Sequence, residues 1–211
     1  MTTADTLAHL LHLMDFAGVA IFAATGALVA ARRGRTLVTF IAFAIVAGVG
    51  GGTVRDLLLG APVFWVKDPT YISVSMMVAG LVWAAKGRLI SPKPLMWLDA
   101  VGLAAYAALG AAKAASLGAS PLISVVMGVV TATFGGVLRD LFAGRPTLLV
   151  TREIYISAAA LGAVVYVALR LAGASAEVAF ILGAGAAFIL RAAALTLGWS
   201  LPGFDGDPDE D

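Results

Sequence analysis

Seven long apolar stretches, separated by short polar connectors, make up most of this chain. A helix needs about 20 mostly apolar residues to cross the hydrocarbon core of a bilayer. The stretches that reach or approach this length are about 13–31, 37–60, 70–85, 96–116, 120–143, 153–171 and 175–198. Glycine or proline lies in every connector, as tight turns require. The pattern predicts an all-α integral membrane protein with seven transmembrane helices.

The chain contains an internal repeat with an offset of 84 residues. Residues of several chemical types coincide under this shift: Asp15 with Asp99, Gly51-Gly52 with Gly135-Gly136, Arg55-Asp56 with Arg139-Asp140, and Tyr71 with Tyr155. Each unit, about 13–85 and about 96–171, holds three spans, so the second unit enters the membrane from the opposite side. The sequence predicts a 3+3 inverted-topology repeat, a plan used by transporters and some channels, plus one extra C-terminal helix at about 175–198.

Adjacent glycines lie about midway along the second and fifth spans, where each group precedes an Arg-Asp pair. They are Gly50, Gly51 and Gly52 in the first unit, and Gly135 and Gly136 in the second. Glycine weakens a helix, which predicts broken helices whose opened backbone lines a cavity. The capping-box spacing from Thr53 to Asp56 predicts a second half-helix from Thr53. The alternative is that the glycines only allow close helix packing.

Charged groups in hydrocarbon are costly and usually face a protein interior or a water-filled cavity. Neighbouring residues on a helix point to different faces, so Arg55 and Asp56, or Arg139 and Asp140, are not expected to neutralise each other. Partners on other helices are needed. The repeat suggests two interhelical ion pairs, Asp15–Arg55 and Asp99–Arg139. The alternative is that these residues are solvated at the membrane interface.

Lys113, near the end of the fourth span, is a further charge of interest. Its side chain either extends to the interface, as long basic side chains do, or lines a pore and influences conduction or gating. Across all loops, eight basic residues lie on one side of the membrane and three on the other. The positive-inside rule then places the N-terminus outside and the C-terminus in the cytoplasm.

Composition excludes several classes of function. The chain is 61% hydrophobic and 13% charged, against about 45–50% and about 25% in soluble domains. It has no cysteine, which excludes disulfides and thiolate metal sites. No basic tract indicates nucleic-acid binding, and no hydrolase or metalloprotease motif indicates an enzyme. We expect one membrane domain over residues 1–200 and a disordered acidic tail over 201–211.

The doubled Gly-Gly-x-x-Arg-Asp motif and the 3+3+1 arrangement resemble the prokaryotic TRIC (trimeric intracellular cation) channels over about residues 13–198. The resemblance implies a homotrimer in the bacterial cytoplasmic (inner) membrane. Each protomer would hold a pore for K+ and other monovalent cations, lined by the first, second, fourth and fifth spans and kinked at the glycines. It implies no cofactor or metal, with lipid as an allowed bound molecule. Gly50–Gly52, Arg55, Gly135, Gly136 and Arg139 match the family motif.

Two features of the sequence differ from those expected of a simple cation channel. Lys113 corresponds to a lysine that animal members carry in a Lys-Glu-Val motif, but here Ala114-Ala115 follow it, so the motif is incomplete. Basic side chains beside a pore also repel cations, whereas acidic rings or carbonyl oxygens attract them. The competing hypothesis is a secondary transporter of a small solute such as glycine, because inverted repeats also suit alternating access.

Overall fold

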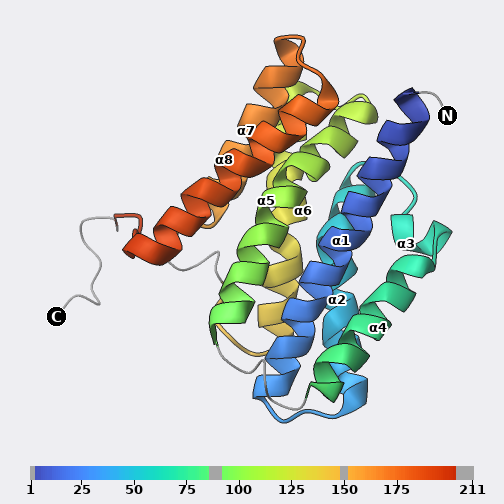
Figure 1. Cartoon of the computed structure of the whole chain (residues 1–211), viewed down its shortest axis with the longest axis vertical. Coiled ribbons are helices and arrows are strands. Elements are labelled where there is room, and N and C mark those ends of the chain that lie inside the picture. The colour runs from blue at the N-terminus through green and yellow to red at the C-terminus, as the bar shows by residue number, and fades with distance from the viewer. Residues whose placement is uncertain (1–2, 86–91, 148–151, 203–211) are drawn as a thin grey trace.

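The computed structural model describes residues 3–85, 92–147 and 152–202, and this part of the chain is helical (Figure 1). The helices are α1 (Thr3–Arg32), α2 (Leu37–Leu58), α3 (Phe64–Lys67), α4 (Thr70–Ala84), α5 (Pro92–Ser116), α6 (Pro121–Phe142), α7 (Ile156–Leu171) and α8 (Ala176–Leu197). The predicted acidic tail lies, from residue 203 onward, outside the described residues.

Local sequence signals explain where these helices begin and end. The side chains of Thr36, Ser120 and Ser175 accept a hydrogen bond from the backbone N–H three residues later, which caps α2, α6 and α8. Glycines with positive φ end or follow six helices, including Gly34 at 57° and its repeat equivalent Gly118 at 82°. Glycine adopts this left-handed conformation without steric cost. The connectors between the spans are therefore set by the same chemistry in both units.

Within the described residues, five helices are long and apolar enough to cross a membrane: the α1 segment Leu13–Arg32, α2, the α5 segment Leu95–Ser116, α6 and α8. The remaining two predicted spans are shorter apolar helices, α4 with 15 residues and α7 with 16. At 1.5 Å per residue they extend only about 22–24 Å. The described part of the chain thus contains the seven predicted apolar helices, but the third helix of each predicted repeat is too short to cross a typical bilayer untilted.

The helices form two groups that meet along a central seam (Figure 1). α1, α2 and α4 contact one another, and α5, α6, α7 and α8 form the second group. Between the groups, α2 packs against α6 and α1 against α5. Each of these pairs joins helices at equivalent positions of the sequence repeat.

Glycines allow α2 and α6 to cross in backbone contact. A Cβ atom on Gly51 would lie 2.2 Å from the carbonyl oxygen of Thr131, and one on Gly135 would lie 2.6 Å from that of Ala47. α2 and α6 continue as single helices through these positions. The predicted broken helices are therefore not confirmed, and close packing, the alternative, accounts for these two glycines.

The predicted half-helix start at Thr53 is wrong. The Thr53 hydroxyl donates a hydrogen bond to the carbonyl oxygen of Val49 at 2.7 Å, one helical turn earlier. Its oxygen also accepts a hydrogen bond from the indole Nε1 of Trp65 at 2.8 Å. Thr53 lies in the interior of α2, so its backbone has no need of a new N-terminal cap.

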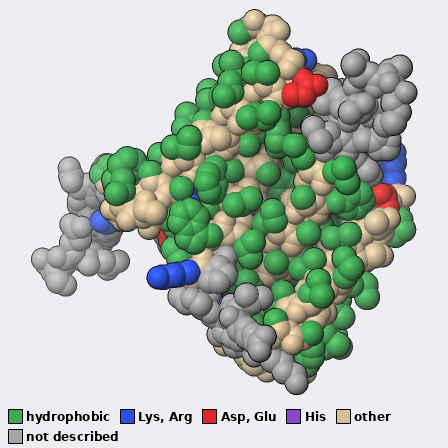
Figure 2. Space-filling model, viewed as in Figure 1, with side chains coloured by type: hydrophobic (Ala, Val, Ile, Leu, Met, Phe, Trp, Pro, Cys, Tyr) green, Lys and Arg blue, Asp and Glu red, His purple; other side chains and the backbone are tan. Residues whose placement is uncertain are grey.

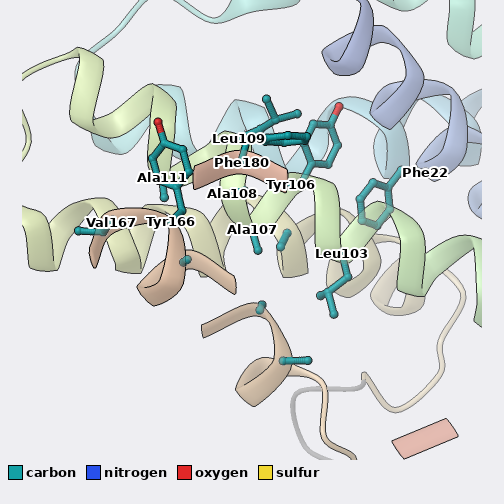
Figure 3. Packing of buried hydrophobic residues seen from close by; sticks show 14 of the residues in the cluster. Phe22, Leu103, Tyr106, Ala107, Ala108, Leu109, Ala111, Tyr166, Val167 and Phe180 are labelled. Carbon is teal, nitrogen blue, oxygen red and sulfur yellow. The ribbon is translucent and has the colours of Figure 1, made fainter. Parts of the chain in front are cut away.

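The core combines alanines with a few aromatic rings (Figure 3). Alanines of α5, such as Ala107 and Ala111, are fully buried and let neighbouring helices approach closely. Phe22 of α1 stacks on Tyr106 of α5, with ring centroids 5.5 Å apart. Hydrophobic side chains also spread over the outer face shown in Figure 2. An apolar exterior over several apolar helices is the arrangement of a multi-pass membrane protein.

Candidate functional site

Two charged cavities lie near opposite ends of the helices. The first, which we call the N-side cavity, has a volume of about 540 Å³ and lies where α5 and α7 end and α8 begins. Its charged and polar lining is Asp15, Arg55, Lys113, Ser116, Tyr166 and Arg170. Arg55 and Asp15 therefore share one cavity, and Lys113 lines the same space.

The second, the C-side cavity, has a volume of about 360 Å³ and lies where α1 and α6 end and α5 begins. Its charged lining is Arg32, Asp99, Arg139, Asp140, Arg145, Glu153 and Arg191. Asp99 and Arg139 are the repeat equivalents of Asp15 and Arg55. Each cavity therefore contains one copy of the same Asp and Arg constellation.

Arg55 pairs with its own neighbour in the N-side cavity. Its Nε and Nη2 atoms both lie 2.8 Å from Oδ1 of Asp56. The backbone N–H of Phe64 donates to the other carboxylate oxygen of Asp56 at 3.0 Å, which holds the start of α3 against α2. The prediction that adjacent residues do not neutralise each other is wrong here, because the long arginine side chain folds back along the helix to reach the carboxylate.

Arg139 joins three charged groups in the C-side cavity. Its Nη1 atom donates to Oδ1 of Asp99 at 2.8 Å, so the predicted interhelical Asp99–Arg139 pair is confirmed. Its Nε and Nη2 atoms donate to the two oxygens of Asp140 at 3.0 and 3.1 Å. Only 3% of Arg139 and 4% of Arg55 are exposed. Both arginines are therefore buried, and the alternative of arginines solvated at the interface is wrong.

Gly136 leaves the space in which this charge cluster fits. A Cβ atom there would lie 2.9 Å from the hydroxyl of Tyr155 and 3.6 Å from both Oδ1 of Asp99 and Nη2 of Arg139. Gly52, its equivalent, faces the ring of Phe64 instead, at 2.7 Å. The same glycine position therefore has a different neighbour in each unit: Gly136 borders the charge cluster, whereas Gly52 borders an aromatic ring.

Asp15 is less buried than Asp99. Tyr71 donates a hydrogen bond to its Oδ2 atom at 2.9 Å, and Tyr106 donates to its backbone oxygen at 3.1 Å. Asp15 lines the N-side cavity together with Arg55. The Asp15–Arg55 ion pair itself stays a prediction.

Arg191 and Glu153 are site residues that the sequence interpretation missed. Nη2 of Arg191 lies 2.6 Å from Oε2 of Glu153, its Nη1 donates to the carbonyl oxygen of Ile154 at 3.2 Å, and its guanidinium lies 5.2 Å from the centre of the Tyr155 ring. A single arginine inside the otherwise apolar segment 175–198 was the available signal, since such a charge usually faces the protein interior. α8 is therefore not a simple packing helix.

Three buried polar atoms near the C-side cavity lack a well-formed hydrogen bond to the described residues, although the Tyr155 hydroxyl lies close enough to the Asp99 carboxylate to interact with it, as its equivalent Tyr71 does with Asp15. They are Oδ2 of Asp99, the hydroxyl oxygen of Tyr155 and Nε of Arg191. Buried polar groups are nearly always satisfied, if not by protein then by water. The described residues contain no group of three or more metal-ligating side chains. This chemistry fits a hydrated passage or a polar ligand site.

Known proteins resemble this chain over most of its length. A family model described as "Glycine transporter" matches twice, over residues 12–86 and 96–170, with the 84-residue offset of the repeat. The UPF0126 membrane protein of Vibrio cholerae is 36% identical, covering 96% of this chain and 85% of that protein. The UPF0126 inner membrane protein YadS of Escherichia coli K12 is 37% identical, covering 92% and 96%.

Among solved structures, the TRIC trimeric intracellular cation channel orthologue from Rhodobacter sphaeroides superposes with a TM-score of 0.87. It is 47% identical, and the match covers 90% of this chain and 99% of that one. The resemblance inferred from the doubled Gly-Gly-x-x-Arg-Asp motif is thereby confirmed. The chain belongs to the prokaryotic branch of the TRIC (trimeric intracellular cation) channel family.

Proposed function

We propose that this protein is a channel for monovalent cations, K+ included, in the bacterial inner membrane. Each protomer of a homotrimer holds its own path, which joins the N-side and C-side cavities. The R. sphaeroides neighbour is a trimeric cation channel, and the E. coli relative is an inner membrane protein. The excess of basic residues around Arg32–Arg35 and Arg145–Arg152 makes the C-side cavity the cytoplasmic one.

One observation carries this proposal: two charged cavities at opposite ends are built on equivalent Arg-Asp pairs. A 3+3 inverted repeat produces that arrangement, and the family model that matches twice supports the repeat. α1, α2, α5 and α6 supply Asp15, Arg55, Asp99 and Arg139 to the path. Contributions from α7 and α8 extend the lining beyond the four helices that the family resemblance implies.

The path narrows where α2 crosses α6 at Gly51 and Gly135. Backbone atoms of the two helices meet directly at this crossing, and the Phe22 ring lies beside Gly135, so a small change in the crossing alters the width of the passage. Cations can pass the arginines because carboxylates neutralise them, Asp56 for Arg55, and Asp99 with Asp140 for Arg139. Asp99 and Asp140 also place carboxylate oxygens on the lining of the C-side cavity, the kind of ligand that cation pathways use.

Recording from purified protein in planar bilayers under a KCl gradient tests the proposal. We expect discrete conductance steps that reverse near the K+ equilibrium potential. The description of the family model favours the second candidate, a carrier of glycine. Saturable glycine counterflow in vesicles, with no conductance steps in bilayers, would establish the carrier and overturn the channel.

Lys113→Gln is expected to raise the single-channel K+ conductance about 1.3-fold in 0.1 M KCl. Lys113 lines the N-side cavity. A unit charge about 10 Å from a hydrated ion repels it by roughly 0.4 kcal/mol in salt-free water and by roughly 0.15 kcal/mol in 0.1 M KCl, where the Debye length is about 10 Å. The gain should vanish in 1 M KCl, where the Debye length is about 3 Å. Lys113→Arg keeps the charge and serves as the control. Equal conductance of all three proteins in 0.1 M KCl would place Lys113 away from the ion path.

A further inference from the structure

A tyrosine contacts the repeated aspartate in both units. The hydroxyl of Tyr71 donates to Oδ2 of Asp15, which lines the N-side cavity, at 2.9 Å. The hydroxyl of Tyr155 lies close enough to the carboxylate of Asp99, which lines the C-side cavity, to interact with it. The 84-residue offset relates the two tyrosines and the two aspartates. Each cavity therefore contains an aspartate in contact with a tyrosine at the start of α4 or α7.

The two tyrosine rings have different neighbours. The ring of Tyr71 stacks on that of Phe16, with ring centroids 4.2 Å apart. The repeat equivalent of Phe16 is Ala100, which has no ring to place against Tyr155. The guanidinium of Arg191 lies 5.2 Å from the centre of the Tyr155 ring instead. Tyr71 is thus supported within its own unit, whereas Tyr155 is supported by α8, which lies outside the repeat.

Arg191 contacts three consecutive residues that end with this tyrosine. Its Nη2 lies 2.6 Å from Oε2 of Glu153, and its Nη1 donates to the carbonyl oxygen of Ile154 at 3.2 Å. Ser200, after the end of α8, forms an isolated antiparallel bridge with Glu153. Only 3% of Arg191 and none of Tyr155 is exposed. A cation and an aromatic ring attract each other more strongly when both are removed from water, so this contact holds the ring firmly.

We propose that Arg191 is a positioning residue, which holds the ring of Tyr155 and thereby orients the Asp99 carboxylate in the C-side cavity. A tyrosine hydroxyl oxygen lies in the plane of its ring, so a fixed ring fixes where the hydroxyl meets the carboxylate. A Cβ atom on Gly136 would lie 2.9 Å from the Tyr155 hydroxyl and 3.6 Å from Oδ1 of Asp99, so both groups border the same glycine. Oδ1 of Asp99 in turn accepts a hydrogen bond from Nη1 of Arg139 at 2.8 Å.

This arrangement gives α8 an influence on one cavity that it does not have on the other. Asp99 helps to neutralise Arg139 in the path proposed above, and an effect of α8 on ion passage therefore rests on the proposed function. The positioning of Asp99 through Tyr155 is a property of the fold and does not depend on conduction.

Fluorine NMR of the full chain labelled with 3-fluorotyrosine tests the inference. The chain has four tyrosines, and the Tyr155 resonance is the one that Tyr155→Phe removes. Asp99→Asn should shift this resonance in the otherwise unchanged protein, because it alters the group that the hydroxyl meets. With Arg191→Gln in place the ring is no longer held at the carboxylate. The same Asp99→Asn substitution should then produce less than about half of that shift, as expected for residues coupled in one network.

The equivalent tyrosine provides a matched control in the same samples. Asp15→Asn should shift the Tyr71 resonance equally with and without Arg191→Gln, because Phe16 and not Arg191 stacks on that ring. If Arg191→Gln reduces the responses of Tyr71 and Tyr155 alike, the arginine only stabilises the fold in general, and its positioning role is overturned.

Glu153→Gln provides a milder second variant. The Glu153 side chain is 42% exposed, so this substitution preserves the fold while it removes the charged partner of Arg191. It should reduce the response of Tyr155 to Asp99→Asn by a smaller amount than Arg191→Gln does. A full response in the Arg191→Gln protein, or in the Glu153→Gln protein if the former does not fold, would overturn the proposal. A Tyr155 resonance that ignores Asp99→Asn in the otherwise unchanged protein would overturn it as well.

Discussion

Gly51→Ala is expected to lower the free energy of unfolding by about 2 kcal/mol. Its Cβ atom would lie 2.2 Å from the carbonyl oxygen of Thr131, a backbone atom of α6 that cannot rotate away. Overpacking of this kind costs about 1–3 kcal/mol, and the better helix propensity of alanine returns only about 1 kcal/mol. Because a backbone atom cannot move away, the clash should cost about 3 kcal/mol, and the gain in helix propensity reduces the net loss to about 2 kcal/mol. SDS-induced unfolding of the purified protein in detergent measures the change.

Other glycines of the same chain provide graded controls. A Cβ on Gly50 would meet the Leu138 side-chain end at 2.7 Å, which can move, so Gly50→Ala should cost less than Gly51→Ala. A Cβ on Gly80 in α4 would meet no neighbouring atom within 4 Å, so Gly80→Ala should be neutral or stabilising. If Gly51→Ala proves as mild as Gly80→Ala, the crossing of α2 and α6 is not held by contact at this glycine.

The repeat and the seven apolar helices could be predicted because both depend on periodic local signals. Helix caps such as Ser120 and left-handed glycines such as Gly118 act within a few residues, so the chain displays them directly. The Asp99–Arg139 pair could also be predicted, since a buried arginine needs a charged partner and the repeat singled out one aspartate. Predicting these features does not require knowing how the helices cross.

The role of the glycines could not be decided in the same way. A glycine that weakens a helix and one that admits a neighbouring helix look identical in sequence, and only the approach of Thr131 to Gly51 separates them. The Arg55–Asp56 contact was missed for a related reason. Cβ directions place neighbours on different faces, but a long side chain can bend back to the adjacent carboxylate. Arg191 was missed because its partner, Glu153, lies in a connector far away in the sequence.

Arg139→Gln is expected to lower the free energy of unfolding by about 3–5 kcal/mol, the usual cost of stranding a buried charge. The substitution removes the partner of Asp99 and of Asp140 together. Asp99→Asn should cost only about 2 kcal/mol, because Arg139 then keeps both hydrogen bonds to Asp140. SDS-induced unfolding again provides the measurement, and equal losses for the two variants would contradict the three-group cluster.

A double-mutant cycle and the equivalent aspartate sharpen this result. The losses of Arg139→Gln and Asp99→Asn should not add, because residues in one ion-pair network couple by about 0.5–3 kcal/mol. Asp15→Asn should cost less than Asp99→Asn, since Asp15 is more exposed and screened by water. A loss for Asp15→Asn as large as that for Asp99→Asn would instead support a buried Asp15–Arg55 pair. The two halves of the repeat would then hold their arginines in the same way.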